Sequence, residues 1–301
     1  MRTGKPKFKQ GRLLLLDQFL GCFRGCFMFD YRVMRVVLFT MLLGGSLSLA
    51  ATASAEVISF DNADQPAYAS GWTNLSNGAS NTTVLGPWVF GGNAVSGTSA
   101  MIASSTTLGT SGTIDVNGKS FELSDTTSTG SYIDVFRFIL GDLKVGQTLS
   151  LDMQVNFRGG FKGINIRGAD DSTSLFKFEV GNPGGGDDYV VSNAATGNGS
   201  VGNAYSADTR FNIALEQSSP SGGAWTLTRT GGITSTSLGT YAGQVSSFQL
   251  YTFLAGSSDQ NAIFYNNIQV VPEPATISTL LAAALLGLPW LRRQVSRGYG
   301  G

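Results

Sequence analysis

The stretch from Thr148 to Phe157, TLSLDMQVNF, decides the fold class, because apolar and polar residues alternate along its whole length. Successive side chains of a β-strand point to opposite faces of its sheet, so a period of two predicts a strand with one buried face. The residues expected in the core are Leu149, Leu151, Met153, Val155 and Phe157. Those expected to face solvent are Ser150, Asp152, Gln154 and Asn156.

Similar short runs rich in Val, Ile, Phe, Tyr and Thr recur between positions 57 and 270, separated by clusters of Gly, Ser, Asn, Asp and Pro. No segment in this region keeps an apolar period of 3.6, so the sequence predicts almost no helix. So many strands in one domain favour two packed antiparallel sheets, that is, an all-β sandwich. The other predicted strands cover 57–60, 88–90, 100–103, 120–124, 133–140, 163–167, 175–180, 189–192, 210–217, 224–229, 246–254 and 262–270.

The N-terminal region has the pattern of a secretory signal peptide over residues 34–55. Met34-Arg35 is followed by the apolar run VVLFTMLLGGSLSL at 36–49, and Ala53-Ser54-Ala55 is an A-x-A cleavage site. This order predicts export by the Sec route and a mature chain that begins at Glu56, or at Ser54 if Ala51-Thr52-Ala53 is used instead. Residues 1–33 contain a second apolar patch and acidic residues, so either translation starts at Met34 or the signal peptide carries a long extension.

The C-terminal region, 271–301, combines a Pro-Glu-Pro motif at Pro272, Glu273 and Pro274, an apolar run at 276–291, and basic Arg292-Arg293. Proline lacks an amide donor and favours extended neighbours, so the motif is expected to be exposed to a processing enzyme. The apolar run is short for a membrane span, but snorkelling arginines extend its reach. A buried core helix is the alternative interpretation.

This order of motif, helix and basic end resembles the PEP-CTERM sorting signal of Gram-negative envelope and exopolysaccharide-associated proteins. The resemblance implies that an exosortase-like peptidase is a partner, which recognises the motif and removes a helix that transiently crosses the inner membrane. It also implies a location at the cell envelope, the cell surface or the extracellular matrix.

Charge and cysteine content restrict the function further. Residues 56–271 carry nine Lys or Arg against seventeen Asp or Glu, so the exported part is acidic and nucleic-acid binding is not expected. The chain has no histidine, and Cys22 and Cys26 both precede the signal cleavage site. Ser-His-Asp and Cys-His catalysis and most zinc sites are therefore excluded for the mature chain.

The domain at 56–270 resembles the concanavalin-like jelly rolls that precede such tails. The similarity lies in SGW at 70–72, GPW at 86–88, KSFEL at 119–123, VGQTLSLDM at 145–153 and FKGINIRGADDSTSLFKFEV at 161–180. It implies a fold rather than an activity. In the last predicted strand, Asn266 and Asn267 stand where such sandwiches often have an aspartate, which argues against an inherited calcium role.

Hydrolysis by this domain would have to use carboxylates, and the glucanase pattern E-x-D-x-x-E is absent. The sequence therefore predicts a non-enzymatic protein with no catalytic residues. A glycoside hydrolase or lyase is the alternative, with candidate carboxylates at Glu122, Asp134, Asp152 and Glu179.

A binding role fits the sequence more easily, because sugar rings stack on aromatic faces. Trp72, Trp88 and Tyr189 lie in or beside Gly- and Asn-rich segments, and Trp72 is the preferred surface candidate. No cofactor is expected, although a structural calcium is left open at Asp61, Asp64, Asp187 and Asp188. The sequence thus favours an exported matrix protein that associates with extracellular polysaccharide, with a purely structural matrix protein as a further alternative.

Overall fold

The computed structural model describes residues 57–93, 98–109, 112–125, 132–157, 159–181, 189–193, 197–200, 209–254 and 261–272. The signal peptide expected at 34–55 and the helix expected at 276–291 lie outside these ranges. Within them, no helix is long and apolar enough to cross a membrane. The only helical segments there are two short 3-10 turns, η2 (Pro66–Tyr68) and η3 (Ser105–Leu108).

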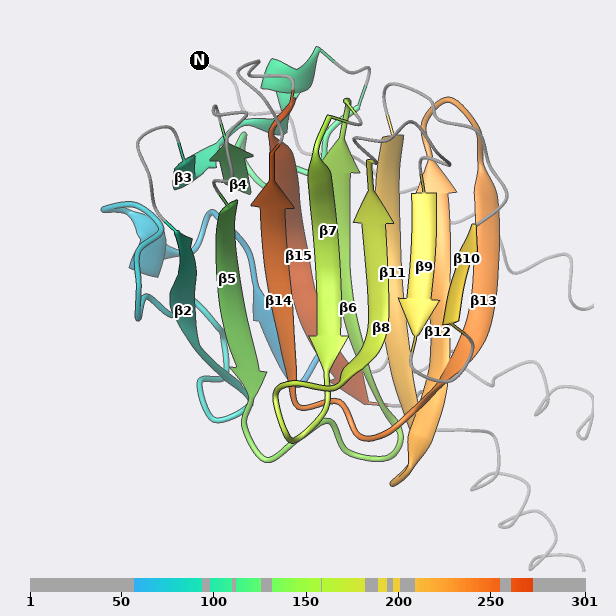
Figure 1. Cartoon of the computed structure of the whole chain (residues 1–301). Coiled ribbons are helices and arrows are strands. Elements are labelled where there is room, and N and C mark those ends of the chain that lie inside the picture. The colour runs from blue at the N-terminus through green and yellow to red at the C-terminus, as the bar shows by residue number, and fades with distance from the viewer. Residues whose placement is uncertain are drawn as a thin grey trace, which may run out of the picture. The chain divides into compact units, whose positions relative to one another are not determined.

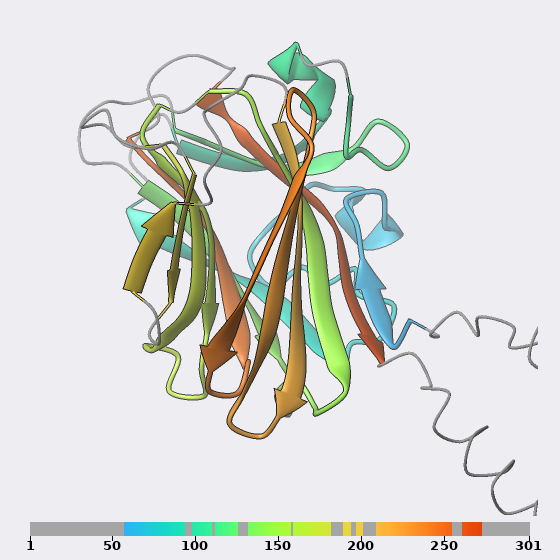
Figure 2. The same ribbon diagram turned by 90° about the vertical axis from the view of Figure 1, so that its right-hand side faces the viewer.

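The described residues form two antiparallel β-sheets packed face to face, which confirms the predicted all-β sandwich (Figures 1 and 2). One sheet has eight strands in the order β13-β12-β11-β6-β15-β4-β3, with β1 paired to β15. The other has seven strands in the order β10-β9-β8-β7-β14-β5-β2. Neighbours in each sheet are often distant in sequence, as β6 and β15 are.

The strands of the eight-stranded sheet are β1 (Ser59–Asp61), β3 (Thr98–Ala103), β4 (Ser120–Asp125), β6 (Gln147–Val155), β11 (Thr209–Ser219), β12 (Gly222–Thr230), β13 (Ser235–Ala242) and β15 (Ile263–Pro272). The strands of the seven-stranded sheet are β2 (Leu85–Asn93), β5 (Tyr132–Ile139), β7 (Phe161–Arg167), β8 (Ser174–Val180), β9 (Tyr189–Asn193), β10 (Gly197–Ser200) and β14 (Ser247–Phe253).

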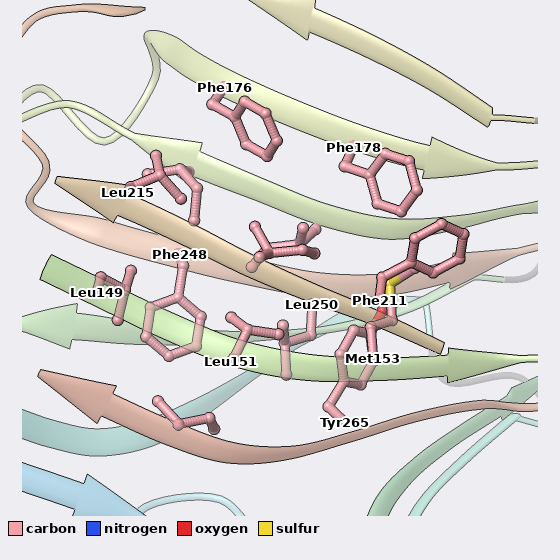
Figure 3. Packing of buried hydrophobic residues seen from close by; sticks show 14 of the residues in the cluster. Leu149, Leu151, Met153, Phe176, Phe178, Phe211, Leu215, Phe248, Leu250 and Tyr265 are labelled. Atoms are coloured by element: carbon pink, nitrogen blue, oxygen red, sulfur yellow. The ribbon is translucent and has the colours of Figure 1, made fainter. Parts of the chain in front are cut away.

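The core lies between the sheets, where side chains from facing strands interdigitate (Figure 3). Leu149, Leu151, Met153 and Val155 of β6 are buried as their alternation predicts. They pack among residues of the opposite sheet such as Phe178 and Leu250. Burial of these large apolar side chains supplies the main driving force for folding, since residues 57–272 contain no cysteine.

The end of β6 departs from the predicted alternation. Gln154 and Asn156 are buried rather than solvent-facing, whereas Phe157 is 49% exposed. Backbone groups of Leu108 and Ile114 supply the hydrogen-bond partners of these side chains. Gln154 Oε1 accepts from the Ile114 amide (3.1 Å), and Asn156 Nδ2 donates to the Leu108 carbonyl (2.7 Å). Both amide side chains, which were predicted to face water, thus form hydrogen bonds with the backbone of another part of the chain.

Candidate functional site

A cavity of about 510 Å³ lies on the outer face of the seven-stranded sheet. It covers the four neighbouring strands β5, β14, β7 and β8, which run side by side in Figure 1. Its walls combine aromatic rings, amides and charged groups. They are Tyr132, Asp134, Phe161, Asn165, Ser174, Lys177, Glu179, Gln249, Tyr251, Thr252 and Phe253.

The strand register brings two carboxylates into one row across the floor of this cavity. Asp134 of β5 pairs with Tyr251 of β14, Tyr251 pairs with Gly163 of β7, and Gly163 pairs with Glu179 of β8. Directly opposed residues in adjacent strands have side chains on the same face of the sheet. Asp134, Tyr251 and Glu179 therefore share the outer face, and together with Gly163 we call them the carboxylate row.

Gly163 leaves a gap in this row that Tyr251 uses. With no side chain on β7 between them, the Tyr251 hydroxyl reaches across the strand and donates to Glu179 Oε2 at 2.8 Å. A Cβ atom at position 163 would lie 2.0 Å from the Phe178 carbonyl oxygen, so the two strands approach too closely for any other residue. The glycine thus permits both the close strand packing and the contact between the two side chains.

Glu179 is also held by a cation from its own strand. Lys177 Nζ lies 2.7 Å from Glu179 Oε2 and 5.3 Å from the centroid of the Tyr251 ring. Burial, followed by the neighbouring Glu179 carboxylate, holds the pKa of Tyr251 well above its ordinary value. Tyr251 therefore stays protonated and acts as a hydrogen-bond donor that fixes the orientation of Glu179.

Asp134, at the other end of the row, has a contrasting environment. Its side chain is only 6% exposed, and Oδ2 accepts from Gln249 Nε2 at 2.6 Å. Oδ1 has no hydrogen-bond partner among the described residues. Burial raises the pKa of this carboxyl, against the opposing influence of the Gln249 hydrogen bond and the charge of Arg167. A carboxyl with a raised pKa in the wall of a cavity is suited to act as a proton donor.

The other two candidate carboxylates lie on the opposite sheet. Glu122 belongs to β4 and Asp152 to β6, both strands of the eight-stranded sheet. Asp152 accepts from Asn212 Nδ2 and Asn267 Nδ2, each at 2.8 Å. It lines a smaller polar cavity of about 250 Å³, in which Asp115 is the other carboxylate. No tryptophan or tyrosine is among the described residues that line this cavity. Of the four candidates, the structure brings together only Asp134 and Glu179.

The aromatic residues predicted to bind carbohydrate are buried, so that prediction is corrected. Trp72, Trp88 and Tyr189 are 3%, 0% and 1% exposed and belong to the hydrophobic core. Trp72 and Trp88 pack edge to face with a centroid distance of 5.1 Å. Trp72 also contacts the rings of Phe90 and Phe121, with centroid distances of 5.3 and 4.8 Å, so it is enclosed by core aromatic residues. None of the three offers a ring face to a sugar.

The acidic pair considered for calcium is used by the protein itself. Asp61 is fully buried in an ion pair with Arg137 and also accepts from the Tyr68 hydroxyl at 2.5 Å. Asp64 lies 2.7 Å from Lys119 Nζ. A guanidinium beside Asp61 repels a cation, so these two residues do not form a calcium site. Asp187 and Asp188 lie outside the described residues.

The residues that complete the site were not singled out from the sequence. Tyr251, Lys177, Gln249 and Asn165 stand in three different strands, β14, β8 and β7. Alternation indicates which residues of a strand share a face, but not which strands become neighbours. The order β8-β7-β14-β5, which interleaves early and late parts of the chain, creates the site.

No known family and no curated protein matches the sequence. Several solved structures share the sheet architecture at low identity. An endo-acting O-glycanase with which members of the human gut microbiota initiate mucin breakdown has a TM-score of 0.42 and 13% identity, over 72% of this chain and 99% of that one. The catalytic domain of a glycoside hydrolase family 131 protein from Coprinopsis cinerea has a TM-score of 0.33 and 9% identity, over 52% of this chain and 72% of that one. The receptor-binding domain of botulinum neurotoxin D has a TM-score of 0.36 and 9% identity, over 64% of this chain and 46% of that one.

The prediction that the protein is not an enzyme is corrected. The structures it resembles include an O-glycanase and a glycoside hydrolase catalytic domain, and this likeness is one of fold alone. The prediction rested on the missing E-x-D-x-x-E pattern, which requires the carboxylates to share one strand. In this chain the two carboxylates come from different strands and meet only through the sheet register.

Proposed function

We propose that the protein is a polysaccharide-active glycoside hydrolase that works through two carboxylates on a concanavalin-like jelly roll. One observation carries the proposal: Asp134, whose pKa is raised, shares a cavity and a cross-strand row with an ion-paired Glu179. Two carboxyl groups in contrasting environments are the usual basis for assigning the acid and the base of a glycosidase.

In the proposed reaction Asp134, in its protonated form, donates a proton to the glycosidic oxygen as the bond from that oxygen to the anomeric carbon breaks. Glu179 accepts a proton from a water molecule, whose oxygen attacks the anomeric carbon from the opposite side. Lys177 and Tyr251 hold Glu179 in place through their contacts with Oε2. Asp134 ends as a carboxylate and Glu179 as an acid, and one proton returned through water restores the starting state.

The spacing of the row favours inversion at the anomeric carbon. Three strand intervals of about 4.8 Å separate Asp134 from Glu179, which places their Cα atoms roughly 14 Å apart. Hydrogen bonds turn both side chains toward β14, Asp134 to Gln249 and Glu179 to Tyr251. The carboxyl groups are thus closer than their Cα atoms, and so wide a row favours the inverting spacing of about 6.5–9.5 Å over the retaining spacing of about 5 Å.

A lyase is less consistent with the same residues. Lyases need a base that removes a proton from the sugar carbon, and Tyr251 is the residue placed for that role. Its pKa is held well above the ordinary value, and its hydroxyl already donates to Glu179. Because a strongly raised pKa keeps the hydroxyl protonated, Tyr251 is better suited to orienting Glu179 than to abstracting protons.

Release of reducing ends from a panel of β-1,3-glucan, β-1,4-glucan, xylan, galactan and alginate tests the proposal. Wild type is expected to degrade at least one polymer, and Asp134→Asn and Glu179→Gln to lose that activity. Asp152→Asn, on the opposite sheet, is the matched control and should retain it. Failure of the folded wild type across the panel, or full activity in both site variants, would contradict the proposal. Products with unsaturated ends would indicate a lyase instead.

We also propose that the protein is exported by the Sec route and processed by an exosortase-like peptidase. The support is the sequence pattern at both ends of the chain: Ala53 and Ala55 at the signal cleavage site, and the motif with the basic Arg292-Arg293 end. The Ile58 amide donates to the Val270 carbonyl at 2.9 Å, so the domain begins and ends on adjacent strands. Replacing Pro272, Glu273 and Pro274 by alanine should change the mass and location of the mature protein in its host. No change would refute the sorting role.

A further inference from the structure

Three aromatic side chains lie in the next row of the sheet beside the carboxylate row. Tyr132 of β5 pairs with Phe253 of β14, and Phe253 pairs with Phe161 of β7. The Phe161 and Phe253 rings are stacked, with centroids 6.1 Å apart at 19°, and Tyr132 meets Phe253 edge to face at 6.4 Å. Tyr132 is 40% exposed. We call these three residues the aromatic row.

The row on the other side of the carboxylates is polar. Gln249 of β14 pairs with Asn165 of β7, which pairs with Lys177 of β8. Asn165 Oδ1 accepts from the Ser174 hydroxyl at 2.6 Å, while its Nδ2 has only a 3.5 Å contact with Gln249 among the described residues. The three consecutive rows along the strands are thus aromatic, acidic and polar.

This arrangement fixes a direction for the substrate, on the condition that the proposed hydrolase function holds. The two carboxyl groups must lie on opposite sides of the bond that breaks. Asp134 and Glu179 are separated across the strands, so the polymer has to pass between them in the perpendicular direction, which is along β14. Successive sugar units on that path lie over the aromatic row and over the polar row.

We infer that the polysaccharide binds along β14 and that a neutral pyranose unit on one side of the cleaved bond stacks on the aromatic row. An aromatic surface of this kind accepts the C–H face of a pyranose ring and offers nothing to a carboxylate or sulfate. The unit on the other side of the cleaved bond receives hydrogen bonds from the Asn165 amide. The substrate class is therefore a polymer with an uncharged hexose or pentose in at least one of the two positions.

Cleavage of a hexasaccharide labelled at its reducing end tests this path. The probe is cut from whichever of β-1,3-glucan, β-1,4-glucan or xylan the wild type degrades fastest. Phe253→Ala should lower kcat/KM about two- to tenfold, as expected for one lost stacking contact. Phe253→Ala and Asn165→Ala should shift the preferred cleavage position in opposite directions, because they weaken sites on opposite sides of the cleaved bond.

Two further variants make the outcome specific. Phe60→Ala removes a phenylalanine that is 39% exposed on the other sheet and should change neither rate nor product pattern. Val190→Asp changes the residue that continues the carboxylate row onto β9, and a polymer lying along β14 does not reach it. If Val190→Asp blocked cleavage while Phe253→Ala and Asn165→Ala acted alike, the path along β14 would be wrong and the hydrolase assignment would stand. A wild type that cleaves none of the polymers refutes the hydrolase itself, and the path with it.

Discussion

Lys162 is a buried lysine whose removal should stabilise the protein in a pH-dependent way. It points inward from β7, is 0% exposed, and its Nζ donates to the Asn261 carbonyl at 2.5 Å. No described carboxylate pairs with it in an ion pair within 4.0 Å. Burial lowers its pKa from 10.5 to about 7. We therefore predict that Lys162→Met, which keeps the length of the apolar stem, raises the free energy of unfolding.

The size and sign of this effect follow from proton linkage. Between pH 7 and 10.5 the unfolded chain holds the Lys162 proton and the folded chain has lost it, so the free energy of unfolding rises with pH across this window. At about 1.36 kcal/mol per unit, the whole shift corresponds to about 5 kcal/mol. The lost hydrogen bond to Asn261 offsets about 1 kcal/mol. The variant should therefore gain up to about 4 kcal/mol at pH 6, and this gain should shrink toward pH 10.

Urea unfolding of wild type and variant at pH 6, 7.5 and 9 measures the effect. Lys144→Met, in the exposed turn between β5 and β6, is the control and should show no comparable pH-dependent difference. Parallel pH profiles for wild type and Lys162→Met would show that Lys162 does not carry an uncompensated charge in the fold, and the reasoning would fail.

Three other predictions concern the core and the site. Asp134→Asn should abolish hydrolysis while leaving thermal stability equal or higher above pH 4, because the raised pKa means that ionised Asp134 costs folding energy as pH rises; a clear loss of stability would contradict this. Arg137→Leu should lower the free energy of unfolding by about 3–5 kcal/mol, measured by chemical denaturation, because it leaves Asp61 buried without its cation. A loss below about 1 kcal/mol would show that the ion pair does not stabilise the fold. Trp72→Ala should lower the free energy of unfolding by about 3–5 kcal/mol without changing KM for the polysaccharide. Unchanged stability with weakened binding would instead show that Trp72 contacts the ligand.

The sequence predicts the fold well because alternation is a local property. Each of the predicted strands corresponds to a strand in the structure. The residues of β6 that were predicted to face the core are buried from Leu149 to Val155. The two strands that were missed, β10 and β13, are edge strands of their sheets and rich in Gly, Ser and Thr. Edge strands bury little on either face, so the hydrophobic signal that marks the others is weak in them.

The site is harder to predict because it depends on pairing between distant strands. Asp134 and Glu179 are 45 positions apart, and Tyr251 is a further 72 positions from Glu179. Two of the four candidate carboxylates belong to the site, but only the register shows which two. The tryptophans were placed wrongly for a related reason. Gly- and Asn-rich flanks indicate a loop, but not whether an aromatic ring beside it packs into the core, as Trp72 does.

The pH dependence of kcat/KM on the most rapidly degraded polysaccharide tests the central claim most directly. The account predicts a bell-shaped profile whose alkaline limb reflects the raised pKa of Asp134, because hydrolysis requires its protonated form. Asp134→Asn should lower kcat/KM by at least a hundredfold and remove that limb, while Asp152→Asn keeps the wild-type profile. A profile in Asp134→Asn that retains both the rate and the alkaline limb would contradict the assignment of Asp134 as the catalytic acid.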